Sequence, residues 1–199
     1  MKILKIIGGI FVALVIIGIF VGDDDTDTNS SSKGSNAISL VETKRPQIQK
    51  DFVNIVSTAQ NESKNTENDM QKGGIISARD KNLCNLLGNN SQITNWTGTV
   101  KKISSNSDGK GVLYVEIAKK VQMQTWNNAF SDIGDKTLIE PETELFNSAA
   151  SLKKGQEVVF SGSIFFSKDG CVKEQSLSLR GKLESPGFTF KFSKIAPLN

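Results

Sequence analysis

The fold is decided by the stretch WTGTVKKISSNSDGKGVLYVEIA, which occupies residues 96–118. Its first part, residues 96–103, is rich in Trp, Thr, Val and Ile, the side chains that favour strands. A polar segment with Asp108 and Gly109 follows and is typical of a turn, and residues 112–118 are again apolar, with alternation in their later half. The stretch therefore predicts two strands joined by a turn.

Strand-like patterns continue towards the C-terminus. They cover residues 121–126, 137–139, 156–166, 172–183 and 188–192. The first of these either extends the preceding strand or begins a third. One helix is expected among them, over residues 141–152, because acidic side chains occupy its first turn and the basic pair at 153–154 and Gly155 follow its end.

This order of strands, with one helix after about the third strand, is that of a small Greek-key OB barrel. Residues 96–100 (WTGTV) look like a first barrel strand, and residues 152–162 (LKKGQEVVFSG) look like the end of the helix and the strand after it. The chain resembles the OB-fold-like, tRNA-anticodon-type domains attached to bacterial exported and membrane proteins of unknown function. The resemblance covers about half of the chain and implies an α+β fold with an OB-like barrel at residues 91–199. It departs from a simple barrel at residues 125–136, which stand where a short turn is expected.

The N-terminal residues 1–22 predict a single transmembrane helix. No charged side chain occurs between Lys5 and Asp23, and the apolar run approaches the roughly 20 residues that cross a bilayer. Because Lys2 and Lys5 flank its start, the positive-inside rule places the N-terminus in the cytoplasm and the C-terminal domain in the periplasm. A cleaved signal peptide is the alternative, although the residues around Gly22 fit the small-residue cleavage pattern poorly.

A linker and a helical neck are expected between the anchor and the barrel. Residues 23–45 predict a flexible linker, because most of them are Asp, Thr, Asn, Ser, Gly or Lys and cannot bury enough apolar surface to fold. Residues 46–90 predict the neck, with an interruption at Gly73 and Gly74. Its first apolar stripe consists of Ile48, Phe52, Ile55, Val56 and Ala59. Such a stripe either packs on the C-terminal domain or pairs with another copy or a membrane partner as a stalk.

Cys84 and Cys171 are the only cysteines. In an exported domain they form a disulfide or remain two unpaired thiols, and we expect the disulfide. It would close a loop of roughly 87 residues and, in the chain-entropy model, stabilise the fold by about 4 kcal/mol. It would also clamp the neck to the barrel.

Composition excludes several kinds of site. The chain contains no histidine, which rules out Ser-His-Asp and Cys-His nucleophilic sites and any zinc site with a histidine ligand. Two cysteines do not make a zinc site by themselves, and the acidic residues between positions 132 and 144 do not match an EF-hand loop. We therefore expect no catalytic residues, no metal and no cofactor.

Charge argues against a nucleic-acid partner. The chain has 24 basic and 21 acidic residues, far from the strongly basic footprint of a nucleic-acid-binding protein. The pairs at 101–102, 119–120 and 153–154 are short and typical of a solvated face.

The most unusual segment is WNNAFSD at residues 126–132, where aromatic side chains alternate with amides and a carboxylate in an expected connection. The candidate ligand-binding residues are Trp126, Asn127, Asn128, Phe130, Asp132 and, on a neighbouring strand, Tyr114. Aromatic side chains of this kind form stacking surfaces. The alternative is that Trp126 and Phe130 cap the end of the barrel.

These observations favour a membrane-tethered extracytoplasmic binding module without catalysis, which recognises a protein or glycan of the envelope. One alternative is a structural or assembly component of the envelope acting through the neck. Another is a carboxylate-dependent hydrolase using Asp132 and Glu140, although no paired-carboxylate motif supports it.

Overall fold

The computed structural model describes residues 40–168 and 170–199. The expected anchor at residues 1–22 and most of the expected linker lie outside this part of the chain. Among the described residues, no helix combines the length and apolarity needed to cross a bilayer.

The described residues form helices and five strands, so the α+β class is confirmed. The helical elements are α1 (Leu40–Thr43), α2 (Gln47–Glu62), the 3-10 helix η1 (Ser63–Asn65), α3 (Asp69–Leu87), α4 (Ala129–Asp132), α5 (Glu144–Ala150) and α6 (Leu179–Glu184). The strands are β1 (Gln92–Ser105), β2 (Gly111–Ala118), β3 (Val121–Gln124), β4 (Glu157–Ile164) and β5 (Gly187–Pro197).

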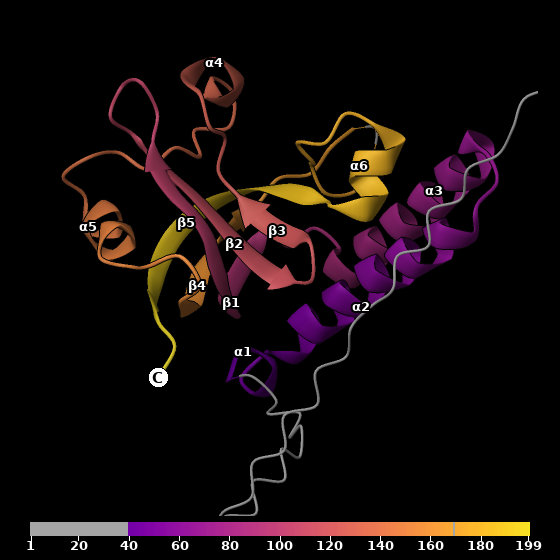
Figure 1. Cartoon of the computed structure of the whole chain (residues 1–199), viewed down its shortest axis with the longest axis horizontal. Helices are drawn as coiled ribbons and strands as arrows, with labels where there is room; N and C mark the ends of the chain where they lie inside the picture. Colours follow the sequence, from indigo (N-terminus) through magenta and orange to yellow (C-terminus); the bar gives the residue numbers. More distant parts are fainter. Residues whose placement is uncertain (1–39, 169) are drawn as a thin grey trace, which may run out of the picture. The chain divides into compact units, whose positions relative to one another are not determined.

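The five strands close on themselves as a barrel in the order β1-β2-β3-β5-β4 (Figure 1). β4 pairs with β1 and completes the ring. All neighbours are antiparallel except β3 and β5, which run parallel. The hairpin expected at residues 96–118 is therefore confirmed as β1 and β2.

Strand β1 is long because it serves two neighbours. Its N-terminal part pairs with β4, for example Trp96 with Phe160, and its later part pairs with β2, for example Val100 with Val115. Gly98 lies where the two pairings meet, and a Cβ atom there would come within 2.5 Å of Val115 Cγ1 and 2.7 Å of a backbone oxygen. The glycine in WTGTV thus allows β2 to approach β1 closely.

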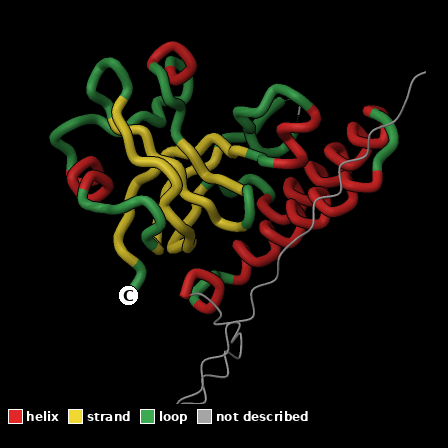
Figure 2. Tube along the Cα trace, viewed as in Figure 1, coloured by secondary structure: helices red, strands yellow, loops and turns green. Residues whose placement is uncertain are grey.

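The core of the barrel is aromatic and continues into the helices. Phe52 of α2 contacts Trp96 of β1 and Phe188 of β5 edge-on, at ring-centroid distances of 5.2 and 5.1 Å. Figure 2 shows α2 and α3 (red) lying together beside the strands (yellow). Phe52 and Val56 are fully buried in the same cluster as the barrel residues, which confirms the packing of the stripe on the C-terminal domain.

The break in the neck lies earlier than the sequence predicts. Helix α3 runs through Gly73 and Gly74, and the chain instead turns between residues 63 and 68. The Asn68 side chain accepts a hydrogen bond from Gln71 N and so starts α3. A strong N-cap outweighs two helix-weakening glycines.

Two strand predictions are corrected. Residues 172–183 form no strand: they make isolated bridges at Val172 and Glu174 and then enter α6, where Ser178 caps the helix. Leu177 is 98% exposed, so the alternation does not reflect a buried face. Residues 137–139 contribute only one bridge, between Ile139 and Gly111. The helix expected at 141–152 is the shorter α5, which begins after the Thr143 cap.

Candidate binding site

The candidate site is the first part of the connection between β3 and α5, residues 125–138, here named the Trp126 loop. It contains the short helix α4, whose N-cap is Asn128: its side chain accepts a hydrogen bond from Ser131 N at 2.9 Å. Figure 1 shows α4 projecting away from the strands. The insertion that the sequence places at residues 125–136 is thus a structured projection.

Asp132 holds this loop from inside. Its side chain is buried and accepts hydrogen bonds from Thr137 N at 2.6 Å, from the Thr137 hydroxyl at 2.7 Å and from Leu138 N at 3.1 Å. Both carboxylate oxygens are therefore engaged within the loop. Asp132 acts in this structure as a positioning residue.

Trp126 is fixed by a second carboxylate, that of Asp135. The indole Nε1 donates a hydrogen bond to Asp135 Oδ2 at 2.7 Å, and the backbone N of Trp126 donates to the Thr137 hydroxyl at 2.8 Å. The Lys173 ammonium lies 2.7 Å from the same Asp135 oxygen and 6.0 Å from the centre of the indole ring. The half-buried indole is thus part of a polar frame, not a free stacking platform.

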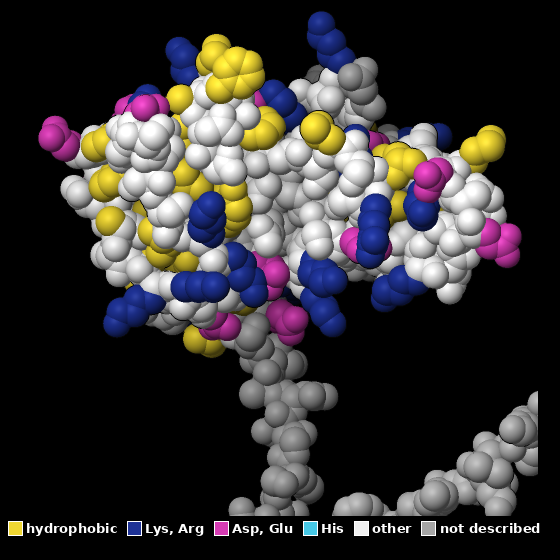
Figure 3. Space-filling model, turned by 45° about the horizontal axis from the view of Figure 1, so that its top comes forward, with side chains coloured by type: hydrophobic (Ala, Val, Ile, Leu, Met, Phe, Trp, Pro, Cys, Tyr) yellow, Lys and Arg dark blue, Asp and Glu magenta, His cyan; other side chains and the backbone are white. Residues whose placement is uncertain are grey.

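The tip of the loop is apolar and exposed. Phe130 is 85% exposed and Ile133 is 71% exposed, and Asn127 and Asn128 beside them are exposed as well. Figure 3 shows hydrophobic side chains protruding where Figure 1 places α4. Phe130 therefore does not cap the end of the barrel.

Tyr114 lies near the start of the loop, opposite Gln124 of β3. It lies on β2, and the Lys102 ammonium is 5.0 Å from the centre of its ring. Burial raises the pKa of the Tyr114 phenol, so the hydroxyl stays protonated at neutral pH. The structure records no contact between Tyr114 and Phe130 among the described residues.

Two partners of the loop were not identified from the sequence. Lys173 and Gln175 come from the connection between β4 and β5, and Gln175 Nε2 donates to the backbone oxygens of Gln124 and Thr125. The alternation within this connection indicates no particular partner, so only the tertiary structure brings Lys173 and Gln175 beside the Trp126 loop.

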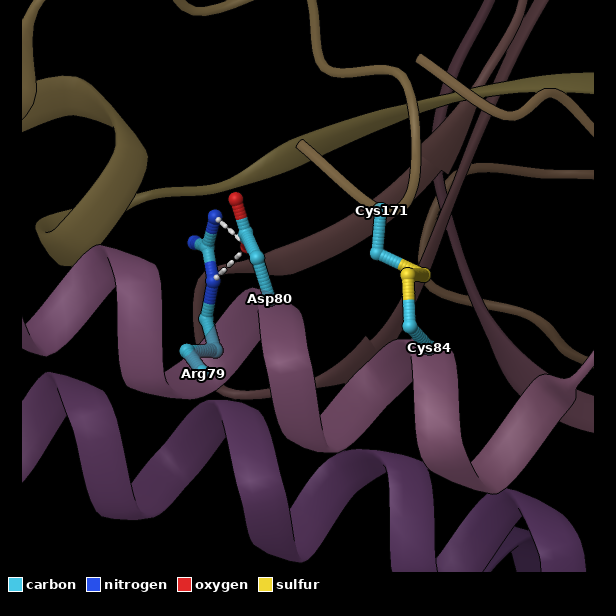
Figure 4. The surroundings of a disulfide bond; sticks show 4 residues. All are labelled: Arg79, Asp80, Cys84 and Cys171. Carbon is cyan, nitrogen blue, oxygen red and sulfur yellow. Dashed lines mark hydrogen bonds and ion pairs between the residues drawn. A yellow bond between two sulfur atoms is a disulfide. The ribbon is translucent and has the colours of Figure 1, made fainter. Parts of the chain in front are cut away.

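The same connection is tied to α3 by the disulfide between Cys84 and Cys171, which confirms the expected bond. The two Cα atoms are 5.3 Å apart, within the usual range for a disulfide. Figure 4 shows the bond one turn along α3 from Arg79 and Asp80. The clamp between the neck and the barrel is therefore covalent.

A buried ionic cluster accompanies the disulfide. The side chains of Arg79 and Glu174 are only 1% and 4% exposed and form an ion pair. Arg79 also donates to Asp80 Oδ1 and to the backbone oxygen of Lys182. Burial raises the pKa of Glu174, and the Arg79 charge offsets part of that effect. Arg79 thereby joins α3 to the β4–β5 connection and to α6.

Both carboxylates considered for a hydrolase are engaged by other residues. Asp132 is engaged by its own loop, and Glu140 forms an exposed ion pair with Lys110 at 2.6 Å. Within residues 40–168 and 170–199, no group of three or more potential ligand side chains is arranged to hold a metal. The sequence gives no match to any protein-family model and no significant match to a curated protein.

Proposed function

We propose that residues 91–199 form an OB-like barrel whose Trp126 loop binds a protein partner outside the cytoplasmic membrane, with residues 1–22 as the tether. The observation that carries this proposal is the exposed pair Phe130 and Ile133 on a loop held by buried carboxylates. Exposed apolar side chains gathered at one protruding tip mark a candidate interaction site.

The strand order supports the OB-like assignment. A five-stranded Greek-key barrel with a helix between the third and fourth strands is the OB arrangement, and its connections commonly carry the ligand site. Here the pairing β1-β2-β3-β5-β4 and the position of α5 after β3 have these features. The α4 projection adds a further element to the β3–α5 connection.

A protein fits the tip better than a glycan. Phe130 and Ile133 form a convex apolar surface, and aromatic and aliphatic anchors that enter a partner's pocket dominate the energy of protein interfaces. The frame of Asp132, Asp135 and Thr137 holds the loop before binding, so little conformational entropy is lost on association.

The cellular location is argued from two features. The apolar N-terminal segment has the length of a membrane span and lysines on its N-terminal side. The disulfide between Cys84 and Cys171 fits a domain that folds in an oxidising compartment such as the periplasm.

The test places a photo-cross-linking residue at position 130 or 177 of the full chain in whole cells. Leu177 is the matched control because it is also apolar and 98% exposed but lies outside the loop. We expect a discrete protein adduct from position 130 that disappears in Ile133→Ala and is absent from position 177. Equal adducts from both positions would contradict the assignment of the site. Protease access from the periplasmic side tests the topology separately.

A further inference from the structure

A second site, lined by no residue of the Trp126 loop, lies between α2, η1 and the β2–β3 hairpin. It is a pocket of about 490 Å³. Three lysines line it: Lys64 from η1 and Lys119 and Lys120 from the hairpin turn. Segments that are more than 50 residues apart in sequence thus bring three lysine residues to the lining of one cavity.

The carboxylates beside this lysine pocket do not neutralise it. Glu184, which lines the pocket, forms an ion pair with Arg180 at 2.8 Å. Glu116, on the strand before the turn, forms an ion pair with Lys101 through Oε1 at 2.8 Å, and its Oε2 accepts a hydrogen bond from the backbone N of Lys120 at 3.2 Å. No ion pair is recorded for Lys64, Lys119 or Lys120 among the described residues. The pocket therefore keeps an excess of positive charge.

The hairpin turn provides an independent observation. Only two residues, Lys119 and Lys120, join the paired ends Ala118 and Val121. Lys120 has φ 62°, the left-handed region in which glycine and asparagine are favoured and lysine is strained. A long cationic side chain thus occupies a backbone position better suited to Gly or Asn. The two-residue turn itself calls for a positive φ, and a lysine at this position places a cationic residue at the pocket.

The remaining lining groups suit an oxyanion. The hydroxyl of Ser57 and the amide of Asn61 line the same cavity, while the Ser63 hydroxyl donates to the backbone oxygen of Gln60 at 2.8 Å and the Gln60 amide donates to the backbone oxygen of Glu184 at 3.4 Å. Lys64 already donates to Asn61 Oδ1 at 2.8 Å, which holds its ammonium at the rim. Compact ammonium groups with neutral donors between them are the pattern of phosphate recognition by lysine.

We propose that the lysine pocket binds a phosphate group, carried either by a small organic phosphate or by a phospholipid headgroup. The cavity is large enough for the phosphate and a short polar substituent, and it lies apart from the Trp126 loop. The site is independent of the proposed protein-binding function, and either assignment can fail alone.

The test follows the backbone amide signals of the full chain by NMR in neutral detergent during titration with inorganic phosphate and then pyrophosphate. A second arm places the chain in nanodiscs of phosphatidylcholine alone or with phosphatidylglycerol. We expect saturable shifts at residues 63, 64, 119 and 120 with the soluble anions. Shifts confined to the anionic nanodiscs would assign the phosphate to a lipid headgroup.

Two variants make the result specific. Lys119→Gln with Lys120→Asn removes two charges while giving the turn a residue that favours a positive φ, so the fold is retained. We expect binding to weaken about tenfold or more, whereas Lys153→Gln with Lys154→Gln, an exposed lysine pair elsewhere, leaves it unchanged. A linear, unsaturable response to the anions together with no difference between the two nanodiscs would overturn the proposal.

Discussion

The side chain of Gln49 pairs with the backbone of Thr97 as a neighbouring strand would. Gln49 Nε2 donates to Thr97 O at 2.6 Å, and Thr97 N donates to Gln49 Oε1 at 2.9 Å. Both residues are buried. One edge of β1 at Thr97 faces β4, and the pairing with β2 begins only at Thr99. The side chain of Gln49 thus bonds the backbone N–H and C=O of Thr97, which β2 does not yet pair with at this position. These bonds fix α2 on the barrel.

Gln49→Leu is therefore expected to destabilise the fold by about 2–4 kcal/mol, because it leaves a buried N–H and a buried C=O without partners. Equilibrium denaturation in urea, read by circular dichroism, measures the change in the free energy of unfolding. Gln47→Leu is the control, since Gln47 is exposed and its side chain donates a hydrogen bond to Asp51 one turn along the same helix. An equally small decrease in the free energy of unfolding in both variants would show that the Gln49 amide does not hold α2 on the barrel.

Gly98→Ala is expected to cost about 1–3 kcal/mol, because the added Cβ meets Val115 and the backbone of Glu116. Gly134→Ala is the matched control: no atom lies within 4 Å of a Cβ built there, and Gly134 does not have a positive φ. The same denaturation experiment compares them. A Gly98→Ala variant as stable as Gly134→Ala would mean that β1 and β2 separate freely at this point.

Removal of the disulfide through Cys84→Ser with Cys171→Ser is expected to lower the stability by about 2–5 kcal/mol. It should also speed hydrogen exchange in residues 165–175, which the bond ties to α3. Because Lys173 and Gln175 brace the Trp126 loop, exchange there is expected to rise as well. Faster exchange restricted to α3 would show that the brace does not depend on the disulfide.

Asp132→Ala is expected to lower the free energy of local opening of the Trp126 loop by about 1–3 kcal/mol, because the backbone N–H groups of Thr137 and Leu138 lose their acceptor. Hydrogen exchange of residues 126–138, measured by mass spectrometry, reports the opening. Asp108→Ala, in the exposed β1–β2 turn, is the control. Unchanged exchange at Leu138 would contradict the role of Asp132 as the internal support.

The pH dependence of stability is expected to contain a contribution from Glu174. Its pKa is raised in the folded state by burial, with Arg79 and Lys182 opposing and Asp80 adding to the rise. A carboxyl group whose pKa is raised in the folded state binds its proton more tightly in the folded than in the unfolded protein. Its contribution to the free energy of unfolding is therefore fully present below the ordinary pKa of about 4.5, and it is lost as the pH rises through the pKa of the folded state. Wild type should therefore lose stability relative to Glu174→Gln as pH increases above about 4.5. A constant difference between the two across pH 4–8 would contradict this.

The strands that the sequence predicts correctly are those with strong local patterns. WTGTVKKI and FTFKF lie within β1 and β5, because β-branched and aromatic residues with period-two alternation favour extended backbone whatever their final neighbours. Residues 172–183 show the limit of this reasoning. Their alternating leucines resemble a strand, yet Leu177 points to solvent and Leu183 is buried from α6.

The segment WNNAFSD stands out in composition. In the structure, Phe130 lies at the exposed tip, Asn128 caps α4, and Asp132 is buried. The roles of individual side chains were not predictable, because Asp132 is buried by hydrogen bonds to Thr137 and Leu138 and Trp126 is held through Asp135 by Lys173. The Lys173 contact spans 38 residues, and no local pattern encodes it.

The sequence by itself determined the apolar N-terminal segment, the absence of histidine chemistry, the β-rich C-terminal half and an interrupted helical region before it. These properties depend on composition and on spacing between near neighbours along the chain. Only the tertiary structure decided that Gln49 completes the edge of β1, that Cys84 meets Cys171, and that Lys64 shares a pocket with Lys119 and Lys120. Those relationships arise when the barrel closes and the helices pack on it. The burial of apolar surface then stabilises contacts between groups that are far apart in sequence and that no local preference brings together.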